Sequence, residues 1–298
     1  MHIVLNPRAG RERGARLRAQ IEREFPKATI WETRFAGHAQ ILACEAAQNG
    51  AKTVVAAGGD GTLCEVLNGL WPFRDSVKLG VLPVGTGNDF ARTLGIGTDF
   101  ARAVQTLQNG VSRRVDVGEI ENSRGEKRRF LNVCGTGFDA LVANRINAMA
   151  SGRFSRFLRG QSAYLCGVAR ELWNLQSAPL ELVLDGQRHE FRAVLCAVAN
   201  ARSYGGGMLV APDAQIDDGF FDVILIENVS RTEFVRAFPG VFRGAHLEHP
   251  KVRSFRAKSV EIASPNALPV LVDGEMSEIL PAKFQILPRA VEFLAPNG

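Results

Sequence analysis

The sequence predicts an α/β protein in which a parallel sheet forms the N-terminal domain and a mainly antiparallel domain follows. Up to Asp116, short apolar runs alternate with helical patterns, which is typical of parallel strands joined by helices. From Val117 onward the runs are alternating or β-rich, and this pattern favours antiparallel strands. We therefore expect two domains, residues 1–118 and residues 119–298.

Four strands, with helices between them, make up the expected N-terminal domain. The strands are short apolar runs, predicted at His2–Leu5, Ala28–Thr33, Thr53–Ala57 and Lys78–Pro83. An arginine-rich helix follows Gly10, and apolar residues at helical spacing predict further helices at Ala39–Gln48, at Leu63–Leu70 and after Asn88.

Three polar or glycine-rich loops follow three of these strands: Asn6–Gly10, Gly58–Thr62 and Gly85–Asn88. Because ligands bind outside the carboxyl ends of parallel strands, these loops should meet at one edge of the sheet. Glycine lets backbone N–H groups approach a ligand closely, and the amides that open a helix favour an anion. Asp60 would repel a phosphate, so it is better placed to hold a cation or take a proton. A plain tight turn is the alternative for Gly58–Thr62.

The second domain is expected to be β-rich, with a hairpin whose turn is Asp185-Gly186. Its predicted strands are Arg129–Val133, Leu180–Leu184, Phe191–Val198, Phe221–Ile226, Ser259–Ala263 and Val270–Asp273. Helices are expected near Ala140–Asn147, Gln161–Trp173 and Arg231–Phe238. No low-complexity linker is visible, so we expect the active site in a cleft between the two domains.

The composition of the 298 residues, 46% hydrophobic and 22% charged, is that of a globular protein and excludes a disordered chain. No apolar run approaches the ~20 residues that a membrane-spanning helix needs. The five cysteines are widely spaced and lie mostly in apolar settings, which predicts buried thiols in a cytoplasmic protein. The net charge of +5 is compatible with a nucleotide, an anionic membrane surface or nucleic acid.

Two common nucleotide motifs are missing, because no Walker A sequence occurs and Gly135-Thr136-Gly137 lacks the third glycine of a dinucleotide fingerprint. Several other short motifs follow one another along nearly the whole chain: Asn6-Pro7-x-x-Gly10, Gly58-Gly59-Asp60-Gly61-Thr62 with Glu65 and Asn68-Gly69, Leu82-Pro83-x-Gly85-Thr86-x-Asn88-Asp89-Phe90-Ala91, Gly135-x-Gly137-Phe138-Asp139-Ala140, Asn200, Gly205-Gly206-Gly207, Pro212-x-Ala214 before Asp218-Gly219, and Asp273-Gly274-Glu275. With this set the chain resembles the diacylglycerol kinase catalytic-domain family, which includes sphingosine kinases and bacterial lipid kinases.

The resemblance implies a nucleotide-binding α/β domain, a β-sandwich-like second domain, and ATP-dependent phosphorylation of a lipid hydroxyl, on diacylglycerol or a related long-chain alcohol. It implies a magnesium position at Asp218, with backbone carbonyls around Gln215 and Phe220, and it assigns Glu275 as the proton acceptor. The nucleotide contacts that it implies are Asn6, Gly10, Thr33, Gly58, Gly59, Asp60, Gly61, Thr62, Glu65, Gly85, Thr86 and Asn88.

This assignment suits the chemistry, because phosphoryl transfer depends on positioning and charge stabilisation. Carboxylates such as Asp60 and Asp218 suit Mg²⁺, which prefers oxygen ligands. Glu275 and Asp60 both qualify as the general base, and the resemblance places Glu275 first. A solvated acidic turn is the alternative for Asp218, and a hairpin turn for Asp273-Gly274. An NAD kinase-like enzyme and a nucleotide-binding regulator without transfer activity stay open as other functions.

The expected partners are ATP, a lipid alcohol and the inner surface of the cytoplasmic membrane, in phospholipid biosynthesis. No nucleic acid is expected, and a homodimer is left open. The stretch from Ala140 to Arg170 contains five arginines and no acidic residue, so it could rest on anionic lipid as a peripheral contact. An ordinary solvated helix is the alternative for that stretch.

Overall fold

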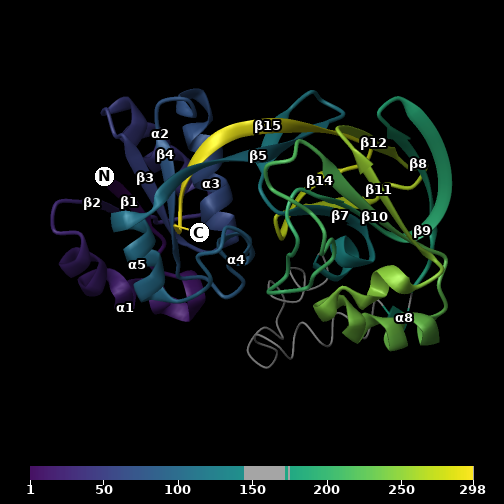
Figure 1. Ribbon diagram of the computed structural model, residues 1–298. Coiled ribbons are helices and arrows are strands. Elements are labelled where there is room, and N and C mark those ends of the chain that lie inside the picture. Colours follow the sequence, from purple (N-terminus) through teal and green to yellow (C-terminus); the bar gives the residue numbers. More distant parts are fainter. Residues whose placement is uncertain (144–171, 174, 298) are drawn as a thin grey trace.

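The computed structural model describes residues 1–143, 172–173 and 175–297, which form two parts joined by two long strands (Figure 1). The first part contains four parallel strands in the order β4-β3-β1-β2. Their bounds are β1 (His2–Leu5), β2 (Thr29–Glu32), β3 (Thr53–Gly58) and β4 (Lys78–Pro83). The predicted N-terminal parallel sheet is therefore confirmed.

Helices pack against this sheet through apolar residues at helical spacing. The third helix, for example, buries Leu63, Val66, Leu67 and Leu70, which lie three or four residues apart on one face. The helices of this part are α1 (Ala9–Glu24), α2 (His38–Gln48), α3 (Asp60–Leu70), the 3₁₀ turn η1 (Trp71–Phe73), α4 (Asp89–Thr93) and α5 (Phe100–Asn109).

The second part is mainly antiparallel, as predicted. Its strands are β6 (Lys127–Phe130), β7 (Val133–Gly137), β8 (Ala178–Leu184), β9 (Gln187–Ala199), β10 (Phe221–Glu227), β11 (Val252–Ala257), β12 (Ser259–Ala263), β13 (Pro269–Val272) and β14 (Glu275–Ile279). The predicted hairpin turn at Asp185 and Gly186 joins β8 to β9, and both residues have a positive φ. Helical segments are residues 138–143, α8 (Arg231–Ala237), η2 (Phe238–Arg243) and η3 (Ala245–Glu248).

The prediction of one strand at Arg129–Val133 is wrong. Leu131 and Asn132 belong to no strand, so β6 ends before them and β7 begins after them. The carboxylate of Asp273 accepts hydrogen bonds from the backbone N–H groups of Leu131, Asn132 and Val133 at 2.9, 2.8 and 3.2 Å. These donors bind a side chain in place of a neighbouring strand. A local pattern contains no sign of a partner that lies 140 residues away.

Two long strands, β5 (Val111–Asn122) and β15 (Ala282–Ala295), run antiparallel to each other from the second part into the first (Figure 1). Sequence analysis did not predict β15. One end of it packs in the second part through Phe284, and the other end packs in the first part, where Phe293 contacts Phe90 with ring centroids 5.1 Å apart. All strands thus belong to one sheet, and we keep the division after residue 118 as a proposal.

Three apolar clusters stabilise the described chain: one in the first part and two in the second. Within the described residues, no helix combines the length and the apolar character needed to cross a membrane. Most of the basic stretch from Ala140 to Arg170 lies outside the described residues, as does most of the helix predicted at Gln161–Trp173.

Candidate functional site

The structure brings the three strand-end loops together around a polar cavity of about 390 Å³ at the edge of the parallel sheet. Nine residues that the sequence assigned to the site line this cavity: Asn6, Gly10, Thr33, Gly59, Gly61, Thr62, Glu65, Gly85 and Glu275. Arg8, which lies in the predicted loop Asn6–Gly10, also lines it, as do Arg34 and Phe35.

Glycine is required where these loops approach one another. Gly10 has φ +59°, and a Cβ there would overlap the carbonyl oxygen of Val84. A Cβ on Gly85 would likewise overlap the Cα of Gly59. The loops after β1, β3 and β4 are therefore in backbone contact, and this contact brings their N–H groups to one cavity.

A side-chain hydrogen bond links the first loop to the start of α3. The amide of Asn6 donates to the hydroxyl of Thr62 at 3.1 Å, while its carbonyl oxygen accepts from the backbone N–H of Arg8 at 3.0 Å. Thr62 in turn packs against Gly58, where a Cβ would overlap its side chain. This contact fixes the first turn of α3 relative to β1.

Asp60 opens α3 and holds the start of α4. Its carboxylate accepts hydrogen bonds from the backbone N–H groups of Asp89 and Phe90, both at 3.1 Å. Burial raises the pKa of Asp60, and the nearby Asp89 carboxylate raises it further. Asp89 itself accepts from the hydroxyl of Ser203 at 3.2 Å and from the backbone N–H of Gly206 at 2.7 Å, so a loop of the second part reaches this group.

Glu275 reaches the same end of α3 from the second part. A Cβ added to Gly61 would lie only 2.7 Å from Oε1 of Glu275, while Oε2 accepts a hydrogen bond of 2.7 Å from Arg128. Glu275 is the first residue of β14 and follows a hairpin turn formed by Asp273 and Gly274, both with positive φ. Asp273 and Gly274 therefore form a hairpin turn, and the same turn places Glu275 at the cavity.

Asp273 anchors this hairpin through its three backbone hydrogen bonds to residues 131–133. Burial raises the pKa of Asp273 to about 6, although its hydrogen bonds to Leu131 and Asn132 lower it. Asp273 therefore fixes the position of the hairpin. Of the two carboxylates, only that of Glu275 lines the polar cavity.

Three other residues predicted to contact the nucleotide, Glu65, Asn88 and Thr86, differ in their contacts and exposure. Glu65 accepts hydrogen bonds from the backbone N–H groups of Gly37 and Ala39 at 2.8 and 3.0 Å, at the start of α2, and still lines the cavity. Asn88 is buried with φ +54° and donates to the carbonyl oxygen of Gly85 at 2.8 Å, which shapes the loop from beneath. Thr86 is exposed on that loop.

The predicted magnesium position lies at a separate acidic cluster that does not line the polar cavity. Asp218 accepts a hydrogen bond from the backbone N–H of Phe220 at 3.1 Å and forms a short ion pair with Arg256. Next to it, Asp116 accepts from the backbone N–H groups of Gly219 and Arg289. Across the described chain, no group of three or more His, Cys, Asp or Glu side chains is arranged to hold a metal ion.

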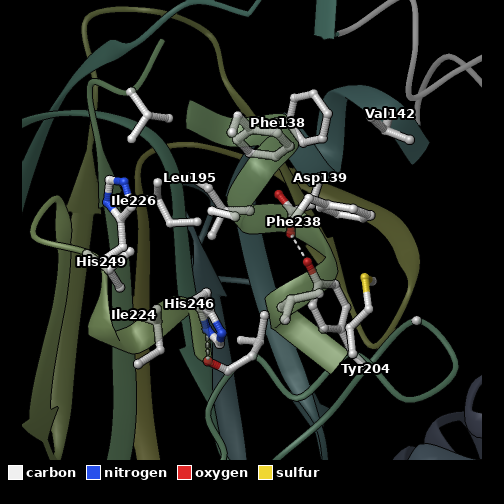
Figure 2. Close-up of a pocket in the computed structure, with 18 of the residues that line it drawn as sticks. Phe138, Asp139, Val142, Leu195, Tyr204, Ile224, Ile226, Phe238, His246 and His249 are labelled. Carbon is white, nitrogen blue, oxygen red and sulfur yellow. Dashed lines mark hydrogen bonds between the residues drawn. The ribbon is translucent and has the colours of Figure 1, made fainter. Parts of the chain in front are cut away.

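A second, apolar cavity of about 320 Å³ lies in the second part (Figure 2). Its walls come from the helical segment 138–143, β9, β10, α8 and η2, and include Phe138, Leu195, Ile224, Phe234, Phe238 and Val241. Gly274 lines this cavity, and the next residue, Glu275, lines the polar one. Adjacent residues of the β13–β14 turn therefore line the two cavities. Sequence analysis missed this cavity, because its residues are scattered over about 140 positions and most of them share only apolar character.

Comparisons with known proteins agree with this arrangement. The family model of the diacylglycerol kinase catalytic domain matches residues 1–120, and that of the YegS C-terminal NAD kinase beta sandwich-like domain matches residues 132–295. The chain is 36% identical over 261 residues to a Mycobacterium tuberculosis diacylglycerol kinase, covering 87% of this chain and 82% of that protein. It is 33% identical over 302 residues to a Bacillus subtilis diacylglycerol kinase, covering 99% and 96%.

A solved structure shows the same fold. The crystal structure of a Bacillus anthracis protein, provisionally described as a diacylglycerol kinase, superposes with a TM-score of 0.77 at 28% identity, covering 99% of this chain and 96% of that one. The expected fold class, with a β-sandwich-like second part, is therefore confirmed. The chain belongs to the diacylglycerol kinase catalytic-domain family, a family of lipid kinases.

Proposed function

We propose that this protein transfers the γ-phosphoryl group of ATP to the hydroxyl of diacylglycerol or a related long-chain alcohol. The observation that carries the proposal is that adjacent residues line the two cavities. Glu275 lines a polar, glycine-lined cavity suited to phosphates, and Gly274 lines an apolar cavity suited to a lipid chain. A kinase for lipids needs both environments at one reacting hydroxyl.

The polar cavity is the proposed nucleotide site. The backbone N–H groups that open α3 favour negative charge, and Arg8 and Arg34 line the same cavity. The absence of side chains at Gly59, Gly61 and Gly85 lets phosphates approach the backbone. We assign phosphate contacts to these amides and to Asn6, Gly10, Gly58 and Thr62, and nucleotide contacts around the rim to Thr33, Glu65 and Thr86. The buried Asn88 would support the site indirectly, by holding the loop that contains Gly85.

Glu275 is the proposed general base. Arg128 binds one carboxylate oxygen of Glu275 and thereby orients the side chain, while the other oxygen lies beside Gly61 at the cavity. As the phosphoryl group arrives, the acceptor hydroxyl would pass its proton to that oxygen. Asp60 is less suited to this role, because its two oxygens hold the start of α4.

Asp60 and Asp89 fit a divalent cation beside the phosphates better than Asp218 does. A Cβ on Gly87 would lie 3.0 Å from an Asp60 oxygen and 3.1 Å from an Asp89 oxygen, so both carboxylates lie next to Gly87, which has no side chain between them. An ion such as Mg²⁺ there would offset phosphate charge. A metal at Asp218, with carbonyls of Gln215 and Phe220, would first have to displace Arg256.

The apolar cavity favours a lipid acceptor over NAD. Its lining is almost entirely hydrophobic, whereas a dinucleotide would place a charged pyrophosphate and two ribose rings there. The NAD kinase likeness of the second part is therefore best read as a likeness of fold. The intact set of Asp60, Arg128 and Glu275 also argues against a regulator that has lost transfer activity.

A membrane surface is the proposed source of the lipid. The inner face of α8 and η2 lines the apolar cavity, while their outer face exposes Val235, Phe242 and three arginines, Arg231, Arg236 and Arg243. An exposed face that mixes apolar and basic residues suits anionic lipid, at about 1 kcal/mol for each well-placed arginine.

Steady-state kinetics of Glu275→Gln test the proposal. Gln keeps the shape but cannot accept the proton, so kcat should fall by about 10²–10⁴-fold while the KM for ATP stays near that of the parent. Glu261→Gln on β12, whose carboxylate pairs with Lys283 on the surface, is the matched control and should keep full activity. Near-normal kcat in Glu275→Gln would remove the base role, and ATP use that no lipid alcohol stimulates would overturn the lipid kinase itself.

A further inference from the structure

One ionisable group stands out in the apolar cavity. Asp139 projects into the cavity wall beside Tyr204, surrounded by Phe138, Leu195 and Phe238 (Figure 2). The phenolic hydroxyl of Tyr204 donates to Oδ2 of Asp139 at 2.9 Å, and the backbone N–H of Ala140 donates to Oδ1 at 2.8 Å. A carboxyl group is unusual in a space that is otherwise suited to a hydrocarbon chain.

Within the described residues, Asp139 has no counter-charge. Other polar side chains at this cavity have contacts within the fold: Glu233 binds Ser230 and Lys251, and His249 accepts from the backbone N–H of Lys251. Nε2 of His246 contacts the carbonyl oxygen of Val210, while its buried Nδ1 has no partner among the described residues. Burial raises the pKa of Asp139 to about 6, against the effect of its two hydrogen bonds. An ionised carboxylate offers about four lone-pair sites, so it can accept further donors from a ligand.

The position of this pair connects it to the reaction site. Tyr204 follows Ser203 and precedes Gly206 in the loop that binds Asp89, and Asp89 neighbours Asp60. Asp139 packs against Gly135 of β7, which pairs with Leu271 of β13, three residues before Gly274. A lipid in this cavity whose hydroxyl reaches Glu275 would therefore have its headgroup along the same stretch of wall as Asp139.

We propose that Asp139, held by Tyr204, anchors the headgroup of the acceptor lipid and selects single-chain alcohols with a second hydrogen-bond donor, a hydroxyl or an ammonium group. This inference rests on the proposed lipid kinase function. A monoacylglycerol offers one hydroxyl for phosphorylation and a second for Asp139. A diacylglycerol has a single hydroxyl, and its ester carbonyls would place lone pairs against the carboxylate.

The size of the cavity agrees with this selection. Its volume of about 320 Å³ lies near the lower end of the ~300–1,000 Å³ range of small-molecule sites, which suits one alkyl chain better than two. Sites that hydrogen-bond a substrate hydroxyl can reject the analogue that lacks it by ~10⁴–10⁵-fold. For this cavity we expect a smaller preference, of about 10²-fold in kcat/KM.

The test compares 1-monooctanoylglycerol with 1,2-dioctanoylglycerol in detergent micelles for the parent protein, Asp139→Asn and Asp222→Asn. Asp222 is a matched control, because burial also raises its pKa to about 6 but it does not line the cavity. The parent should favour the monoacyl lipid by about 10²-fold. Asn offers a donor to ester carbonyls, so Asp139→Asn should bring the ratio close to unity with an unchanged KM for ATP, and Asp222→Asn should keep the parent ratio.

A parent preference for the diacyl lipid, or a ratio unchanged in Asp139→Asn, would overturn the anchor. If the parent phosphorylates no lipid alcohol, the proposed function fails. Binding of a fluorescent monoacylglycerol without nucleotide then still tests whether Asp139 anchors the headgroup. In that assay a loss of at least about tenfold in Asp139→Asn supports it, and equal binding contradicts it. If Asp139→Asn does not fold, Tyr204→Phe replaces it as the test, because it removes the donor to Oδ2 of Asp139. Tyr204→Phe should lower the preference for the monoacyl over the diacyl lipid, and an unchanged preference would count against the anchor.

Discussion

The polar and apolar cavities differ in how the chain builds them. The polar cavity comes from loops at the ends of β1, β3 and β4, in which glycines and one or two polar residues recur at short spacing. The apolar cavity comes from the helical segment 138–143, β9, β10, α8 and η2, and each element contributes a few ordinary hydrophobic residues. The comparison shows that a site for phosphates constrains the local backbone, whereas a site for a hydrocarbon chain constrains only the surrounding volume.

Asp60→Asn should break the polar site with the largest effect. An amide has one acceptor oxygen in place of two, so one of the backbone donors from Asp89 and Phe90 loses its partner and the negative charge is lost. We expect kcat/KM to fall by about 10³-fold or more in a protein that still folds. Asp99→Asn is the matched control, because Asp99 also accepts a backbone hydrogen bond at a helix start but lines neither cavity. Full activity in folded Asp60→Asn would remove Asp60 from the mechanism.

The Tm of Asp139→Asn and of the parent, measured over a series of pH values, tests whether the apolar cavity raises the pKa of Asp139. The pKa of Asp139 is raised from 3.8 to about 6 by folding, so the folded parent binds more protons and loses stability as the pH rises from 4 to 6. Two units of pKa set an upper limit of about 3 kcal/mol. Asn cannot ionise, so the Tm of Asp139→Asn relative to the parent should increase across this interval. A difference in Tm that is independent of pH would contradict the raised pKa.

Ala237→Trp should separate the two cavities functionally. Ala237 lies at the end of α8 and lines the apolar cavity, so an indole ring there would occupy space meant for the lipid chain. We expect the KM for the lipid to rise by about 30-fold while the KM for ATP stays the same. Ala237→Ser, of nearly the original size, should behave like the parent. A parallel rise in the KM for ATP would show that the cavities do not act independently.

Gly61→Ala should have the smallest effect and should sharpen the role of Glu275. Gly61 has ordinary helical geometry, so Ala is tolerated by the backbone, but its Cβ would lie 2.7 Å from Oε1 of Glu275. The flexible carboxylate would move, and kcat should fall by about tenfold with no loss of Tm. Gly69→Ala is the contrasting variant: its Cβ would overlap the backbone of Gln40, so it should lose stability and leave kcat unchanged. Unchanged kcat in Gly61→Ala would argue against proton transfer at this position of Glu275.

The sequence alone predicted the parallel first part, the antiparallel second part and the loops around the polar cavity. Apolar periodicity reports local burial, and glycine reports places where two backbones touch, as at Gly10 and Gly85. Both signals act over a few residues. They therefore found β1 to β4 and the β8–β9 hairpin with nearly correct bounds.

Only the tertiary structure decided how the two parts are joined, which side chains meet Glu275 and Asp60, and where a lipid chain could lie. The strand β15 crosses between the parts, Arg128 binds Glu275 across 147 positions, and Asp89 binds a loop more than 110 positions later. The break between β6 and β7 depends likewise on Asp273. Contacts of this kind depend on burial and geometry between distant segments, and the identity of one residue carries no information about a partner so far along the chain.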